Sequence, residues 1–155
     1  MPKIRSYLLN LLARHRIINM RRSSREIAFQ VLYQSEFAPA LSVRDTAHAA
    51  SEAMKSESAD PETLDFARQL VDGVQAKKSD IDAKIQSASQ HWKIERMASV
   101  DRNLLRLAVF EMIFAPNPLK PAIVINEAVE LAKKFGSSES ASFVNGLLDQ
   151  IGRGL

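Results

Sequence analysis

Apolar residues recur at intervals of three and four positions along almost the whole chain, which is the spacing of one face of an α-helix. Cap residues and prolines divide this pattern into segments, because proline fits the first turn of a helix and prevents a helix from continuing through it. We find no segment with the alternating pattern of a half-buried strand. The pattern therefore predicts an all-α protein.

Seven segments from residue 20 onward carry the helical spacing, at about residues 23–37, 42–54, 61–78, 79–88, 100–114, 121–135 and 138–151. Ser23 to Glu26 has the arrangement of a capping box, which predicts that the first helix begins there. Pro61 and Pro121 each suit the first position of a helix, and Gly136 suits the left-handed residue that ends one. The short connections predict that neighbouring helices pack antiparallel.

The segment at 100–114 is apolar on nearly all sides, which is typical of a central, buried helix. An irregular stretch precedes it and contains Trp92, which we expect to fill part of the core. The chain is of single-domain length, at 155 residues.

Charge is distributed unevenly along the chain. Residues 1–25 contain seven basic and no acidic side chains, whereas residues 26–155 contain 14 basic and 18 acidic ones, so that +7 and −4 combine to a net charge of +3. A basic arm on an acidic body predicts an anionic partner, with nucleic acid the commonest and an anionic membrane the next. A merely solubilising tail is the alternative.

Residues 1–19 form an extension that precedes the helical domain at 20–155. Their apolar spacing and arginines allow an amphipathic helix, and an organellar transit peptide is one interpretation of it. The apolar run is too short to span a bilayer and no signal-peptide cleavage site follows it. Met20 directly precedes Arg21 and Arg22, and we favour it as the true initiator, with residues 1–19 as translated upstream sequence. We expect a cytoplasmic protein.

The sequence offers no catalytic or cofactor chemistry. The chain has no Cys, which excludes disulfides, thiolate metal sites and a Cys nucleophile. His15, His48 and His91 are isolated, and we interpret the acidic neighbours of His48 as a solvated ion pair. The glycines are scattered, so no phosphate-binding loop is present. We expect a protein that is not an enzyme and that holds no metal or cofactor.

Four residues of the first helix follow one another at helical spacing and form one stripe: Arg22, Arg25, Phe29 and Tyr33. Cations beside aromatic rings suit single-stranded RNA, because arginine contacts phosphate while rings stack on bases. This stripe should lie opposite the apolar face of the helix. For Phe29 we favour the alternative that it packs in the core, whereas for Tyr33 both interpretations stay open.

Arg102 and Arg106 lie one turn apart on the helix that is otherwise buried. Two cations at such a place predict a functional role, and RNA is the partner we consider. The alternative is that they pair with Asp101 or Glu95.

Four motifs occur in a fixed order along residues 20–155, and together they resemble the NusB family of bacterial transcription antitermination factors. They begin at Met20, Ser99, Ala122 and Ser142 and read MRRSSREIAFQVLYQ, SVDRNLLRLAVFE, AIVINEAVELAKKFG and SFVNGLLD. The resemblance covers the helical domain alone and begins at Met20, which supports the proposed start site.

The resemblance implies a seven-helix fold in which a three-helix N-terminal bundle packs on a four-helix C-terminal bundle. It implies binding to the single-stranded boxA element of nascent ribosomal RNA, together with the ribosomal protein NusE, within an RNA polymerase complex that holds other Nus factors.

The resemblance also implies roles for individual residues. RNA-binding residues would be Arg21, Arg22 and Arg25, although Ser23 interrupts the arginine run. Tyr33 and Arg106 match positions near the RNA path, and Asp101 and Glu139 would face NusE. The alternative function is a helical protein-interaction bundle that forms a homodimer and does not recognise RNA specifically.

Overall fold

The computed structural model describes residues 2–37 and 61–155, and the regular elements in these two ranges are all helical. The α-helices are α1 (Pro2–Phe37), α3 (Pro61–Ala76), α4 (Lys78–Ala88), α5 (Ser99–Val109), α6 (Pro121–Phe135) and α7 (Ser140–Arg153). A 3-10 turn, η1 (Ile94–Arg96), precedes α5, and a π-helical turn, η2 (Phe110–Phe114), extends it. The helix predicted at 42–54 lies outside the described residues. The all-α prediction is confirmed.

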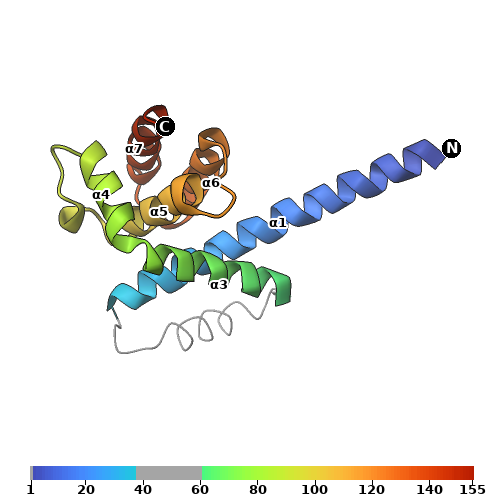
Figure 1. Ribbon diagram of the computed structural model, residues 1–155, viewed down its shortest axis with the longest axis horizontal. Coiled ribbons are helices and arrows are strands. Elements are labelled where there is room, and N and C mark those ends of the chain that lie inside the picture. The colour runs from blue at the N-terminus through green and yellow to red at the C-terminus, as the bar shows by residue number, and fades with distance from the viewer. Residues whose placement is uncertain (1, 38–60) are drawn as a thin grey trace.

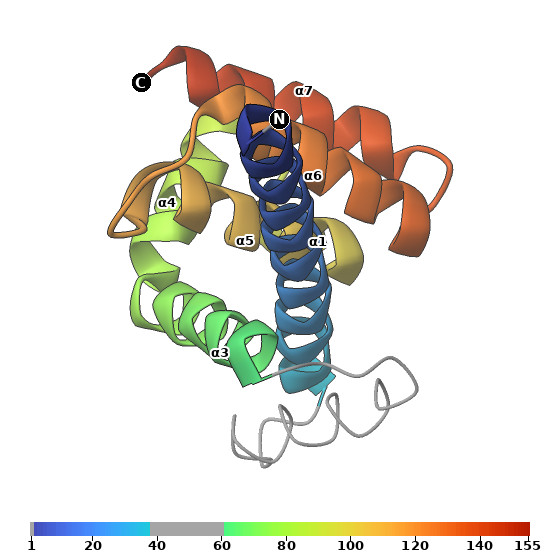
Figure 2. The same ribbon diagram turned by 90° about the vertical axis from the view of Figure 1, so that its right-hand side faces the viewer.

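Helix α5 lies at the centre of the molecule and contacts α1, α3, α4, α6 and α7. Figure 1 shows α1 and α3 side by side on one side of α5 and the pair α6 and α7 on another, with the N-terminal half of α1 projecting away from the body. The view along α1 in Figure 2 shows the other helices grouped around its C-terminal half. The prediction of a central, buried helix is confirmed.

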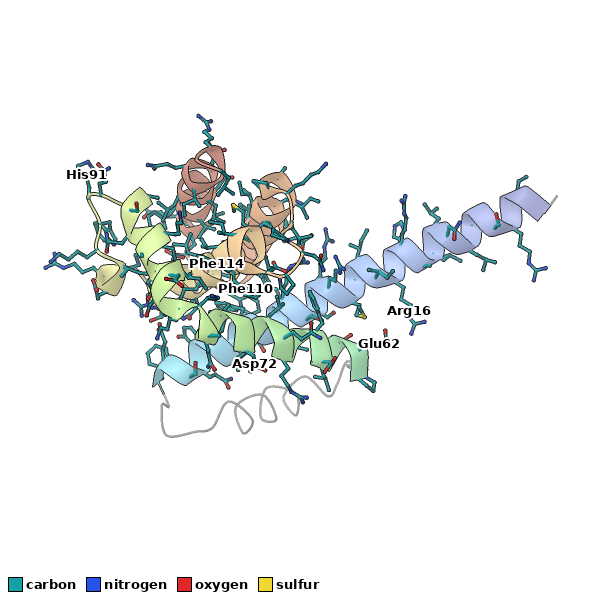
Figure 3. The ribbon with its side chains drawn as sticks, in the orientation of Figure 1. Arg16, Glu62, Asp72, His91, Phe110 and Phe114 are labelled. Carbon is teal, nitrogen blue, oxygen red and sulfur yellow. The ribbon has the colours of Figure 1, made fainter. Side chains whose placement is uncertain are left out.

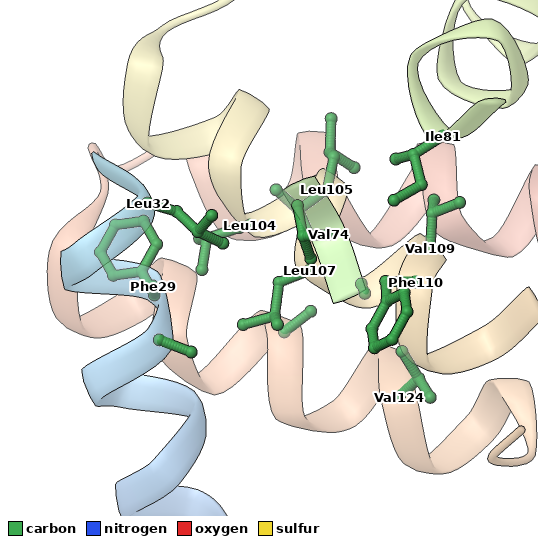
Figure 4. Close-up of a cluster of buried hydrophobic side chains, with 14 of the residues drawn as sticks. Phe29, Leu32, Val74, Ile81, Leu104, Leu105, Leu107, Val109, Phe110 and Val124 are labelled. Carbon is green, nitrogen blue, oxygen red and sulfur yellow. The ribbon is translucent and has the colours of Figure 1, made fainter. Parts of the chain in front are cut away.

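The core is built from apolar side chains that α1, α3, α4 and α6 direct toward α5 (Figure 4). Helix α7 adds Val144 and Leu148 to it. Leu104, Leu105 and Val109 of α5 are almost completely buried. Phe110 of η2 lies against α3, where a Cβ built on Gly73 would be only 2.1 Å from its ring. Because real Cβ atoms essentially never approach so closely, any larger residue at position 73 would force the Phe110 ring or α3 to move.

Helix α1 does not begin at the predicted capping box. It runs unbroken through Ser23 and Ser24, and the buried Ser24 hydroxyl oxygen lies 2.9 Å from both the carbonyl oxygen of Met20 and that of Thr63. The prediction was wrong because a serine inside a helix can bond to the carbonyl four residues earlier. This serine joins α1 to α3 instead of capping α1.

Two further local predictions were wrong. Trp92 does not fill the core, because 54% of it is exposed, and the neighbouring Ile94 is buried in its place. Gly136 ends α6 as predicted, but in an extended conformation with φ −92° and ψ −174°. A Cβ at this position would lie 2.4 Å from Ser140, so close approach to the start of α7 explains this glycine. Among the described helices, none is long and apolar enough to cross a membrane.

Candidate nucleic-acid interface

A cleft of about 360 Å³ lies between α1 and α6, and charged side chains line most of it. Arg22 lies in this cleft with its Nε 3.1 Å from Glu127. Lys134 and Glu26 approach to 2.7 Å, which joins the end of α6 to α1. The outer parts of Arg22 and Lys134 stay in solvent, with 54% and 58% of their side chains exposed. The cleft therefore presents cations that internal carboxylates partly neutralise.

Arg25 lies one turn after Arg22 and is buried. Its Nε donates to both carboxylate oxygens of Glu111, at 3.0 and 2.8 Å, and only 6% and 5% of the two side chains are exposed. Glu111 belongs to η2, so this ion pair joins α1 to the end of the central helix. Each of these buried charges needs the other to neutralise it, since neither has another counterion at comparable distance in the described structure.

Arg21 points about 100° away from Arg22 around α1 and does not line the cleft. The centre of its guanidinium lies 5.6 Å from the centroid of the Phe66 ring on α3, a cation–π arrangement. Arg21 is exposed, and no ion pair joins it to another residue in the described part of the chain. Arg21 and Arg22 thus emerge on either side of the buried Arg25.

The predicted stripe on α1 is correct in its spacing but wrong in its surroundings. Phe29 is buried, with its ring centroid 5.1 Å from that of Phe135 on α6, which confirms the favoured interpretation of this residue. Tyr33 is half-buried and packs between Phe29 and Phe37 at centroid distances of 6.1 and 5.0 Å. Helix α1 is covered on more than one side, because α3 packs on one side and α5 and α6 on another. The stripe lies on the side of α5 and α6.

Arg102 and Arg106 are engaged by carboxylates from other helices. The Nη2 and Nε of Arg102 bond to Glu36 at 2.8 and 2.9 Å, and its Nη1 donates to the Met97 carbonyl at 2.9 Å. Arg106 bonds to Glu36 at 2.9 Å and, through two nitrogens, to Asp82 at 2.8 and 3.0 Å. The partners are therefore not Asp101 or Glu95, which sequence reasoning considered.

The charges in this network stabilise one another. Burial raises the pKa of Glu36, but the hydrogen bond from Arg102 and the charges of Arg102 and Arg106 outweigh it and hold the pKa below its usual range. The hydrogen bond to Glu36 likewise raises the pKa of Arg102 against the effect of burial. The network connects the C-terminal end of α1 with α4 and α5.

The two residues expected to face NusE lie in different environments. Asp101 is 9% exposed, and its Oδ1 has no hydrogen-bond partner within the described residues. Glu139 is exposed and precedes the first residue of α7. The structure brings neither into the cleft between α1 and α6.

Sequence reasoning missed the carboxylates that hold these cations: Glu36, Asp82, Glu111 and Glu127. One signal was available, because Glu111 is an acidic residue within an apolar segment, and a buried acid needs a buried cation. The others come from helices far apart in sequence, and only the fold reveals them. In the described ranges, no group of three or more His, Asp or Glu side chains could hold a metal ion.

Comparisons with known proteins agree with this architecture. The sequence model of the NusB family matches residues 22–153. The transcription antitermination protein NusB of Bdellovibrio bacteriovorus is 53% identical over 136 residues, which are 88% of this chain and 97% of that protein. The T. maritima NusB structure matches with a TM-score of 0.75 and 31% identity over 86% of this chain and 90% of that chain.

A solved complex of the antitermination factors NusB and NusE with double-stranded RNA contains a further match, with a TM-score of 0.74 and 29% identity over 88% of this chain and 98% of that chain. The family model spans most of the chain, and the identity to the Bdellovibrio protein extends over nearly its full length. This chain belongs to the NusB family.

Proposed function

We propose that this protein is a non-catalytic transcription antitermination factor that binds boxA of nascent ribosomal RNA together with NusE and helps RNA polymerase to read through terminators. The observation that carries this proposal is the pair of exposed, adjacent arginines on α1, Arg21 and Arg22, of which Arg22 lines the charged cleft. Relatives named as antitermination proteins, and a relative solved with NusE and RNA, support it. The nascent transcript is cytoplasmic in bacteria, so we expect the protein there.

The environment of each cation suggests its role. Arg21 and Arg22 are exposed and would neutralise phosphates, with Lys134 at the far side of the cleft. Arg25 is buried on Glu111 and would hold α1 in place beneath them. RNA contacts by Arg25, Tyr33, Arg102 and Arg106 stay predictions, and the ion pairs of the three arginines would have to open first.

Asp101 and Glu139 would contact NusE. A buried carboxylate oxygen without a hydrogen bond is costly, and a donor from a partner protein would remove that cost at Asp101. NusE would also add a second surface for the RNA, with a coupling of about 1–3 kcal/mol.

The test is a titration of boxA RNA and a scrambled RNA of equal length, each with and without NusE. We expect tighter binding of boxA in the presence of NusE. Equal binding of both RNAs under that condition would contradict the proposal. The variant Arg21→Ala/Arg22→Ala should weaken binding to both RNAs and reduce the salt slope by about 0.7 per lost phosphate contact. Arg153→Ala, which removes an exposed cation at the end of α7, is the matched control.

We also propose that translation begins at Met20. The family match begins at residue 22, and the described side chains at positions 4–19 are exposed. Intact mass of the natively expressed protein tests this proposal, and a mass that includes residues 1–19 would overturn it.

A further inference from the structure

A second cavity of about 610 Å³ lies between α3, η2 and the loop that follows η2, and Arg21 is the residue of α1 in its lining. This volume is within the range of sites that hold small organic groups. Its lining is mainly apolar, and Phe66, Phe110 and Phe114 contribute three aromatic rings. Figure 3 shows Phe110 and Phe114 beside α3, the helix from which Asp72 comes.

The fold keeps this cavity open. Phe110 is 7% exposed and rests against Gly73, so its ring forms a fixed inner wall. Phe66 and Phe114 are only half-buried and form the outer part. Leu119 completes the wall, and its backbone N–H donates to the Glu111 carbonyl at 3.0 Å, which holds the loop after η2 in place.

Arg21 lies at the mouth of this cavity. Its guanidinium carbon lies 5.6 Å from the centroid of the Phe66 ring. A cation–π contact of this kind at an exposed site is weak, so the guanidinium can exchange it for an anion. A phosphate held there would place the attached nucleotide beside the aromatic rings.

The remaining charges of the lining do not oppose such an occupant. Glu111 lines the cavity, but Arg25 pairs with both of its carboxylate oxygens. Asp72 on α3 and Lys77, which follows α3, also line the cavity, and both are exposed, so that solvent screens their charges. With Glu111 neutralised by Arg25, the lining keeps two cations, Arg21 and Lys77, against the one acid Asp72, and this balance favours an anionic group.

We propose that this cavity receives one unstacked base of the bound RNA strand, with Arg21 moving from the Phe66 ring to the adjoining phosphate and the base stacking on that ring in its place. This inference rests on the proposed function. It specifies where the RNA strand continues from Arg22 at the cleft past Arg21. Single-stranded RNA suits such a site, because its bases can leave the stack and pack on aromatic side chains. Apolar and aromatic walls accept any base, so the site would contribute affinity more than sequence preference.

The experiment is an abasic scan of the boxA RNA, in which one base at a time is removed while every phosphate stays, with binding measured in the presence of NusE. We expect removal of the base in the cavity to weaken binding by about fivefold or more. In Phe66→Leu, which keeps an apolar side chain but removes the ring, the intact RNA should bind correspondingly less well. Removal of that same base should then cost little further, because the two changes delete one interaction.

Phe66→Tyr retains the ring, so each abasic position should cost as much affinity as in the wild type. Trp92→Leu removes an exposed aromatic side chain at a distant turn and should likewise leave these affinity losses unchanged. Thermal unfolding of each variant confirms that it is folded. Wild-type binding of boxA with no abasic position coupled to Phe66 would overturn the cavity assignment and leave the proposed function intact. Absence of boxA binding by the wild type would instead overturn the proposed function.

Discussion

The surroundings of Arg21, Arg22 and Arg25 determine what each of these arginines can do. Arg25 donates to a buried carboxylate, Arg22 is half exposed and donates to a carboxylate that is 14% exposed, and Arg21 lies over an aromatic ring. Three cations within five residues therefore differ in how readily they can exchange an internal partner for an external anion.

The buried pair of Arg25 and Glu111 allows a test that separates stability from RNA binding. Arg25→Met should lower the free energy of unfolding by about 3–5 kcal/mol, because it leaves a buried carboxylate without its counterion. Combining it with Glu111→Leu should recover most of this loss. Urea unfolding measures both effects. A variant Arg25→Met with wild-type stability and no RNA binding would instead identify Arg25 as a phosphate contact.

The pair of Arg22 and Glu127 predicts a gain in function. Glu127→Gln removes a negative charge from the cleft where phosphate would lie, which is worth about 1 kcal/mol for charges 4 Å apart in water. RNA affinity at low salt should therefore rise about fivefold, as measured by fluorescence anisotropy. Asp149→Asn removes a carboxylate from a surface pair on α7 and is the control. An equal rise in RNA affinity in Asp149→Asn would show that the effect comes from net charge and not from the position of Glu127.

Among the elements, α1, α4 and α5 are joined by the network around Glu36, and this network predicts a dependence of stability on pH. The folded protein holds the pKa of Glu36 below its ordinary value of 4.5, so folding favours the ionised form. This contribution is fully present above about pH 4.5 and is lost as the pH falls through the folded-state pKa. Glu36→Gln lacks this dependence.

We therefore expect wild type to exceed Glu36→Gln in stability by about 1.5–3 kcal/mol at pH 7, from hydrogen bonds to a charged group. The difference should shrink as the pH is lowered from 5 to 3, as followed by urea unfolding at each pH. Glu130→Gln, which breaks an exposed pair, should show almost no difference at any pH. A gap that widens in acid would contradict the assigned direction.

Two glycines in helices should respond oppositely to alanine. Gly73→Ala places a Cβ against the Phe110 ring and should cost about 1–3 kcal/mol through overpacking. Gly146→Ala on α7 meets nothing within 4 Å and should stabilise by up to about 1 kcal/mol through helix propensity. Thermal unfolding compares them, and equal effects would show that the contact between α3 and η2 relaxes without cost.

The helices were largely predictable from sequence, because each one carries its own apolar spacing and many ends carry a proline or glycine. Pro61 and Pro121 begin helices as expected, and residues 100–109 are central. The site was less predictable. Spacing places Arg22, Arg25 and Phe29 on one stripe of α1, but which helix covers that stripe depends on contacts more than 80 residues apart in sequence.

At the scale of the whole molecule, the N-terminal half of α1 extends beyond the packed helices (Figure 1). It exposes several large apolar side chains, among them Ile4, Leu8 and Leu12. A chain that begins at Met20 should therefore unfold with the same free energy as the longer chain, within about 0.5 kcal/mol. Chemical denaturation measures this, and a loss of more than 2 kcal/mol would show that the extension supports the fold. RNA binding should be retained as well.

The π-helical turn has a consequence for the changes in length that this chain can accept. The N–H of Ala115 donates to the Phe110 carbonyl at 2.8 Å, five residues earlier. The turn closed by this hydrogen bond contains one residue more than an α-helical turn. Deleting a residue there would rotate the following chain by about 100° relative to α5. Helix α6, with Glu127 and Lys134, would then no longer lie in register with α1. Insertions and deletions within this turn should therefore be more damaging than substitutions.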